Sequence, residues 1–188
     1  MELALPKEFV LWDLEYTAWK GSRERNWSGP NEYKEIIQVG AVRVQDFAET
    51  SVFFEYVKPV KNPLLSEFIV ELTGVTQKNI DEEGVSFEAA LDTFQQFLEK
   101  TLAYCWGIDT EILEGNSALL GGALQLSREQ FHNIKPLVVP LLQKLEIDET
   151  KYSSGTLIQA FGNSKRRAHD AVNDMRNLLD AIVELRKI

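Results

Sequence analysis

The chain has 188 residues, of which 44% are hydrophobic and 26% charged, the ordinary composition of a globular domain with a sizeable core. Its net charge of −9 argues against a protein that wraps duplex DNA with a broad basic surface, but it is compatible with a site built from several carboxylates. No apolar run approaches the roughly 20 residues that span a bilayer, and the first residues lack the pattern of a secretory signal, so we expect no membrane partner.

Cys105 is the only cysteine and cannot form an intrachain disulfide. This fits a reducing compartment, and we expect a cytoplasmic location. Because Cys105 lies in an apolar run, a buried structural thiol is expected rather than a nucleophile.

Hydrophobic patterning predicts a single domain over residues 1–188, without repeats or long linkers. In the first part of the chain it predicts three strands, Phe9–Leu14, Ile36–Val44 and Ser51–Val57. A turn around Asp46 indicates a hairpin between the second and third strands. Pro59 and Pro63 then break the pattern, and a short helix over Ser66–Leu72 is expected to end at Gly74.

The second part of the chain alternates helices and short strands. The clearest helix, Ser86–Lys100, has Ser86 as its cap and one apolar face. The remaining predicted elements are the strand Leu102–Trp106, the helix Thr110–Leu120, the strand Phe131–Lys135, the helix Pro136–Leu145 and the amphipathic helix Asp170–Arg186. A strand meander followed by alternating helices and strands predicts an α/β fold with a mixed sheet of about five strands, flanked by helices.

Two acids end the first predicted strand. Asp13 and Glu15 are two residues apart, so on a strand their side chains share one face at its carboxyl end. Like charges held this close are costly unless a positive charge lies between them, and a divalent metal ion is the usual reason for such a pair. The alternative is that the strand ends there and both acids face water.

Asp109 follows the predicted strand Leu102–Trp106. If that strand lies parallel beside the first, Asp109 reaches the same edge of the sheet as Asp13. The alternative, which does not exclude the first, is that Asp109 caps the next helix.

The last helix opens with His169, Asp170 and Asp174. Asp170 and Asp174 are four residues apart and share a helical face, so spacing alone does not identify which of them is a ligand. A histidine among acids is suited to accept a proton near neutral pH. The alternative is an ordinary surface or core histidine.

In this order the motifs resemble those of the DnaQ-like 3′–5′ exonucleases, in their histidine-containing (DEDDh) branch of the RNase H-like superfamily. The first motif is similar to Asp13-Leu14-Glu15-Tyr16-Thr17, the second to Trp106-Gly107-Ile108-Asp109, and the third to His169-Asp170-Ala171-Val172-Asn173-Asp174. Residues 35–42 and 72–76 resemble two further family stretches. The resemblance covers nearly the whole chain.

The resemblance implies a metal-dependent exonuclease that hydrolyses phosphodiester bonds and releases nucleoside 5′-monophosphates. It assigns Asp13, Glu15, Asp109 and Asp174 as ligands of two divalent cations, Mg²⁺ or Mn²⁺. It assigns His169 as the general base, and leaves Asp170 as a helix cap. The absence of a Cys/His cluster argues against zinc.

Two residues depart from the family pattern. Tyr16 stands where many members have a small threonine, and Gln38 where many have glutamate. Both lie outside the catalytic positions, so they bear on subfamily and substrate rather than on activity. The second strand and the overall size are most similar to the Eri-type exonucleases, which trim RNA ends.

The expected partner is the 3′ end of a single-stranded nucleic acid, RNA or DNA. The first motif supplies Leu14, Tyr16 and Thr17 as candidate substrate-binding residues. Trp19 and Trp27 flank three basic residues in the sequence of a predicted loop. Aromatic rings in such a loop can stack on bases, and its cations can bind phosphates. The alternative is that both tryptophans pack into the core.

A dense basic run, Lys165-Arg166-Arg167, precedes His169 and either steers phosphate toward the site or forms a solvated loop. Two other functions stay open: a binding module without catalysis, and a carboxylate-metal endonuclease on a related sheet. The sequence does not distinguish RNA from DNA, nor does it determine protein partners or the oligomeric state.

Overall fold

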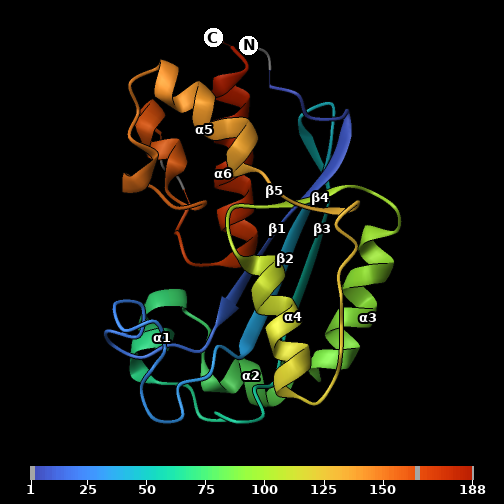
Figure 1. Ribbon diagram of the computed structural model, residues 1–188, viewed down its shortest axis with the longest axis vertical. Helices are drawn as coiled ribbons and strands as arrows, with labels where there is room; N and C mark the ends of the chain where they lie inside the picture. The colour runs from blue at the N-terminus through green and yellow to red at the C-terminus, as the bar shows by residue number, and fades with distance from the viewer. Residues whose placement is uncertain (1–2, 164–165, 188) are drawn as a thin grey trace.

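The computed structural model describes residues 3–163 and 166–187, and they form a mixed five-stranded sheet (Figure 1). The strands are β1 (Glu8–Tyr16), β2 (Ile36–Gln45), β3 (Ala48–Tyr56), β4 (Ala103–Cys105) and β5 (Phe131–Asn133). Their order is β3-β2-β1-β4-β5; β1 to β3 form an antiparallel meander, and β4 and β5 run parallel to β1. The predicted mixed sheet is therefore confirmed.

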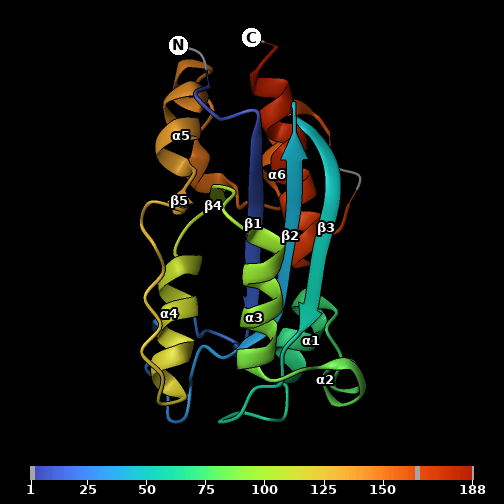
Figure 2. The same cartoon turned by 90° about the vertical axis from the view of Figure 1, so that its right-hand side faces the viewer.

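Helices cover both faces of the sheet, with α5 and α6 on one side and α3 and α4 on the other (Figures 1 and 2). They are α1 (Glu67–Thr73), α2 (Gln77–Glu83), α3 (Phe87–Leu98), α4 (Asp109–Leu119), α5 (Lys135–Lys144) and α6 (Ala171–Leu185), with 3-10 turns η1 (Glu149–Lys151) and η2 (Leu157–Phe161). Across the described ranges, none of these helices combines the length and the apolar character that crossing a bilayer requires.

The predicted elements differ from the observed ones mainly at their ends. Ser86, predicted as the cap of its helix, and Asp170, which the resemblance leaves as a helix cap, are the N-caps of α3 and α6, and each accepts a backbone N–H of the first turn. The sequence pattern does not predict α2, which begins with a capping box between Thr76 and Asn79 and has one buried residue, Ile80.

Alternation along β1 determines which way its acids point. Phe9 and Leu11 belong to the core beneath α6, whereas Val10 and Trp12 belong to the core beneath α3. Asp13 and Glu15 continue the first series because side chains two apart share a face, so both acids face the side that carries α6.

The start of α6 lies directly against β2. Gly40 pairs with Asp13 across the strands, and a Cβ atom at Gly40 would lie 2.6 Å from the Cβ of Ala171. The neighbouring Gln38 is buried, and its Oε1 accepts the backbone N–H of Ala171 at 2.9 Å. The absent side chain at Gly40 and the amide of Gln38 therefore bring the first turn of α6 beside the acids of β1.

Candidate active site

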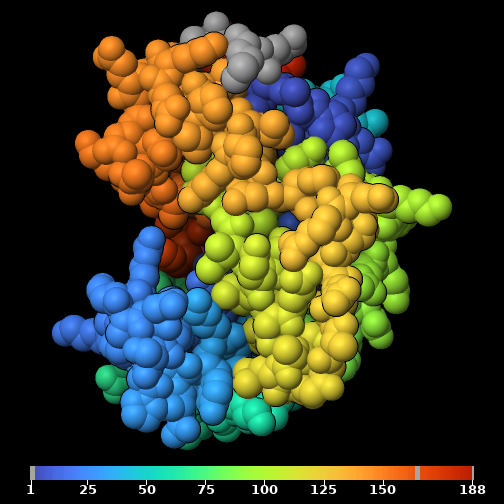
Figure 3. Space-filling model, in the orientation of Figure 1, coloured from blue at the N-terminus to red at the C-terminus, as the bar shows by residue number. Residues whose placement is uncertain are grey.

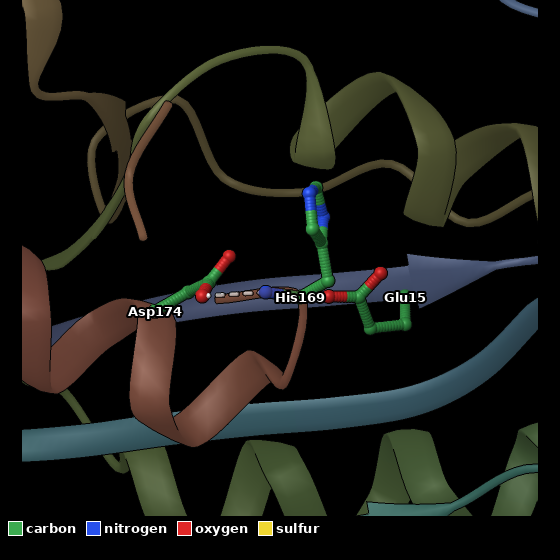
Figure 4. A group of neighbouring side chains, drawn as sticks. All are labelled: Glu15, His169 and Asp174. Atoms are coloured by element: carbon green, nitrogen blue, oxygen red, sulfur yellow. Dashed lines mark hydrogen bonds between the residues drawn. The ribbon is translucent and has the colours of Figure 1, made fainter. Parts of the chain in front are cut away.

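Three of the five predicted catalytic residues meet at the end of β1. Glu15 comes from the strand, His169 from the segment before α6, and Asp174 from the first turn of α6 (Figure 4). Each offers a ligand atom, and these atoms all lie within 4.8 Å of one another. The structure thus brings together residues that are more than 150 positions apart in the chain.

Asp13 and Asp109 lie outside this group of three but line the same cavity, whose volume is 720 Å³. The pairing of β4 with β1 joins Ala103 and Tyr104 to Val10 and Leu11, and the buried carboxylate of Asp109 lies close enough to Asp13 for its charge to raise the pKa of that acid. Asp109 is the first residue of α4, and the preceding Ile108 occupies the cap position. The prediction that Asp109 reaches the edge of the sheet near Asp13 is confirmed, whereas the N-cap assignment is wrong.

The four carboxylates are buried close to one another, and this shifts their pKa values upward. Burial, followed by the charges of the neighbouring acids, raises the pKa of Asp13 and Glu15 well above the ordinary range. Burial raises the pKa of Asp109 to about 6 and that of Asp174 to about 7. The site therefore favours protons or cations among these oxygens.

His169 is half-buried and is held in an unusual backbone conformation, with a φ of 64°. Its backbone N–H donates to Oδ1 of Asp174 at 2.9 Å. Burial, followed by the positive charges of Arg167 and Arg23, lowers the pKa of the imidazole, so the ring is neutral near neutral pH and can accept a proton.

The two acids of the last motif have separate roles in the structure. The carboxylate of Asp170 accepts the N–H of Asn173 at 2.9 Å and caps α6, while Asp174 points into the cluster. Of the two acids, Asp174 therefore lies in the cluster and Asp170 lies at the helix start.

Four of the predicted substrate-binding residues, Leu14, Tyr16, Trp19 and Trp27, line the cavity. Thr17 does not: its buried hydroxyl donates to the carbonyl of Tyr33 at 2.6 Å and accepts the N–H of Glu35 at 3.0 Å. The side chain of Thr17 therefore closes the base of the loop instead of facing the cavity.

Trp27 both packs against a buried cluster and lines the cavity. Its ring packs on Tyr16 with centroids 5.6 Å apart and against the buried cluster around Ile37, and Nζ of Lys34 lies 4.4 Å from its centroid. Its Nε1 donates to the carbonyl of Thr17 at 3.0 Å. Trp27 thus anchors the loop to the strand while one edge faces the cavity.

Figure 3 shows the cavity as a hollow between the blue loop that follows β1 and the orange segments that precede α6. The sequence did not single out five of its lining residues: Phe68, Leu72, Ile108, Ser153 and Ser154. The basic character of the loop pointed to Arg23, and the exposed apolar side chain of Ile108 adjoins the second motif. No local pattern marks the two serines.

The basic run before His169 is only partly visible, because Lys165 lies outside the described residues. Arg166 pairs with Asp180 of α6. The Nη2 atom of Arg167 donates to the carbonyls of Glu71 and Leu72. Both described arginines are thus engaged with the protein itself.

The donor set fits hard divalent cations. Four buried carboxylates supply oxygen ligands, and no basic side chain forms an ion pair with any of them in residues 3–163 and 166–187. Such a cluster is costly without added positive charge, and oxygen donors are those that Mg²⁺ and Mn²⁺ prefer.

Comparisons with known proteins show that the chain is similar to exonucleases. The family model RNase_T, described as exonuclease, matches residues 10–182. ERI1 exoribonuclease 2 of Xenopus laevis is 34% identical over 93 residues, which are 48% of this chain and 12% of that protein. The probable 3′-5′ exonuclease KapD of Bacillus subtilis is 30% identical over 107 residues, covering 55% of this chain and 50% of KapD.

Among solved structures, the nuclease domain of 3′hExo, a DEDDh family member bound to rAMP, superposes with a TM-score of 0.79. The match has 19% identity and covers 98% of this chain and 94% of that domain. This likeness confirms the predicted RNase H-like fold. The chain spans only about an eighth of the ERI1 exoribonuclease 2 sequence that it matches.

Proposed function

This chain belongs to the RNase_T family of exonucleases, and on that premise we propose that it removes nucleotides from the 3′ end of single-stranded RNA or DNA, releasing nucleoside 5′-monophosphates. The observation that carries the proposal is the convergence of Glu15, His169 and Asp174 at one end of a cavity that Asp13 and Asp109 also line.

In this proposal Asp13, Glu15, Asp109 and Asp174 hold two divalent cations, Mg²⁺ or Mn²⁺. When bound, such ions neutralise charge at the phosphate and ease the ionisation of water. The raised pKa values of Asp109 and Asp174 describe the protein without cations, in which burial disfavours the charged carboxylates.

His169 accepts the proton of the attacking water. Its pKa is lowered, so the neutral imidazole is available near pH 7, and its half-buried position leaves the ring accessible to the cavity. Water attacks the phosphorus of the last linkage, and the 3′-oxygen of the preceding nucleotide leaves.

The walls of the cavity support binding of an unpaired strand. Tyr16, Trp19, Phe68 and Ile108 offer aromatic and apolar surfaces to bases, and Arg23 offers a cation to phosphate. We propose an Eri-type preference for RNA, since the relatives that are similar over about half of the chain include proteins named exoribonuclease.

The direct test uses 5′-labelled single-stranded RNA and DNA oligonucleotides with Mg²⁺, Mn²⁺ or chelator. A ladder of products shortened from the 3′ end, mononucleotide release and its loss with chelator are expected, and RNA should be degraded faster. A chain that binds the oligonucleotides without shortening them would instead be a binding module.

A second substrate pair separates exonuclease from endonuclease. The same oligonucleotide with a blocked 3′ end should resist the enzyme, because the terminal residue can no longer enter the cavity. Internal cleavage of the blocked strand would favour the endonuclease reading.

A further inference from the structure

The backbone of His169 is held from its C-terminal side by three contacts. Its own N–H donates to Asp174, Asp170 caps α6, and the N–H of Ala171 donates to Gln38. A φ of 64° is uncommon for a residue other than glycine, and such conformations persist only where the surrounding structure imposes them. The backbone conformation of His169 therefore also depends on contacts on its N-terminal side.

Arg167 supplies a contact on that side, two residues before His169. Its Nη2 donates to the carbonyl of Glu71 at 2.8 Å and to that of Leu72 at 3.3 Å. These carbonyls belong to the last turn of α1, which has no basic residue of its own. A cation at a helix C-terminus is favourable because it neutralises the carbonyl end of the helix dipole.

Gly74 makes room for this contact. It ends α1 with a φ of 80°, and a Cβ atom there would lie 2.7 Å from Nη1 of Arg167. The left-handed φ already favours glycine at the end of α1, and the missing Cβ atom also leaves room for the guanidinium of Arg167.

The partner helix is also a wall of the cavity. Phe68 and Leu72 of α1 line it together with His169. Arg167 thus joins the segment that carries the histidine to a wall of the cavity.

We propose that Arg167 is a positioning residue, whose contact with the C-terminal turn of α1 keeps His169 beside Glu15 and Asp174. The inference rests on the proposed function, because it concerns the group that accepts the proton. Without the contact, the backbone at His169 is held only from the α6 side and the ring spends less time in the productive orientation.

The test compares Arg167→Ala with Arg166→Ala as its matched control. Arg166 is the adjacent arginine, but it pairs with Asp180 of α6, away from α1. Arg167→Ala should lower kcat by about 10- to 100-fold with KM nearly unchanged, the size of effect expected from a misplaced catalytic group. Arg166→Ala should keep wild-type kcat. Mn²⁺ affinity and the melting temperature should match in the two variants.

Two further variants, Arg167→Lys and Gly74→Ala, test the contact between Arg167 and α1 independently. A lysine retains the charge and one donor, so it should recover part of the lost kcat. Gly74→Ala displaces the guanidinium and should lower kcat by itself, but it should lower kcat no further when Arg167 is already alanine.

The proposal is overturned if Arg167→Ala turns over like Arg166→Ala, or if it loses folding or Mn²⁺ binding, since Arg167 would then support the whole structure. Failure of the proposed function looks different: the wild-type protein would not shorten oligonucleotides, or His169→Ala would be as active as wild type.

Discussion

The backbone N–H of His169 donates a 2.9 Å hydrogen bond to Oδ1 of Asp174. One carboxylate therefore anchors the proposed proton acceptor and also belongs to the proposed cation site. Substitutions at the two residues should separate these roles.

His169→Ala should reduce turnover by about 10²- to 10⁴-fold, the usual contribution of a general base. Its affinity for Mn²⁺ should stay close to wild type, because four carboxylates remain. Asp174→Asn keeps an oxygen acceptor for the N–H of His169 but removes a charge, so it should lose both Mn²⁺ affinity and turnover. Titration calorimetry and mononucleotide release measure the two properties. Equal loss of Mn²⁺ affinity in both variants would contradict the assignment.

The melting temperature of the cation-free protein should fall as pH rises from about 5.5 to 8. The pKa of Asp109 is about 6 and that of Asp174 about 7 in the folded protein, against an ordinary 3.8. A raised folded-state pKa means that the folded protein binds these protons more tightly, so the resulting stability is lost progressively as pH rises from about 4 up to 6 for Asp109 and 7 for Asp174. The pKa of His169 is lowered, so this residue makes the stability rise with pH. Its effect is smaller than that of the four carboxylates, whose pKa values are all raised.

Saturating Mn²⁺ should therefore raise the melting temperature more at pH 8 than at about pH 5.5. Asp174→Asn, which cannot titrate at this position, should show a weaker dependence on pH when cations are absent. The prediction would be contradicted if the melting temperature of the cation-free wild-type protein rose steadily over this pH range.

Arg23→Ala should weaken substrate binding. Arg23 lines the cavity and, within the described part of the chain, forms no ion pair, whereas its neighbour Arg25 pairs with Glu32. Loss of a contact to phosphate should raise KM by about 5- to 20-fold with a smaller change in kcat. Lys78→Ala, which removes an exposed charge outside the cavity, is the control and should leave KM unchanged. The same rise in KM in both variants would indicate only a general effect of charge.

Gly40→Ala should destabilise the fold by about 1–3 kcal/mol, because the added methyl group overlaps Ala171 and the backbone of Val172. It should also reduce turnover, since the displaced turn of α6 leads into His169 and Asp174. Gly115→Ala is the matched control: it lies within α4 with nothing in reach of a Cβ atom. There alanine should stabilise the helix by about 0.5–1 kcal/mol. Thermal unfolding and kcat of both variants provide the check.

Local physics explains which parts of the fold could be predicted from the sequence. The apolar run of β1, the turn at Asp46 and the apolar faces of α3 and α6 follow from short-range spacing. β1 extends to Tyr16, beyond the predicted end, because its last residues pair with β2. α2 escaped prediction because one buried side chain leaves no periodic signal.

The sequence by itself determined the residue types of the candidate site and their order: two acids after a strand, a third after the next parallel strand, and a histidine before a helix. It could not decide between Asp170 and Asp174, nor exclude Thr17 from the cavity, because both depend on where distant segments pack. Only the tertiary structure brought Arg167 onto α1. Such contacts join residues far apart in the chain, and no local propensity encodes them.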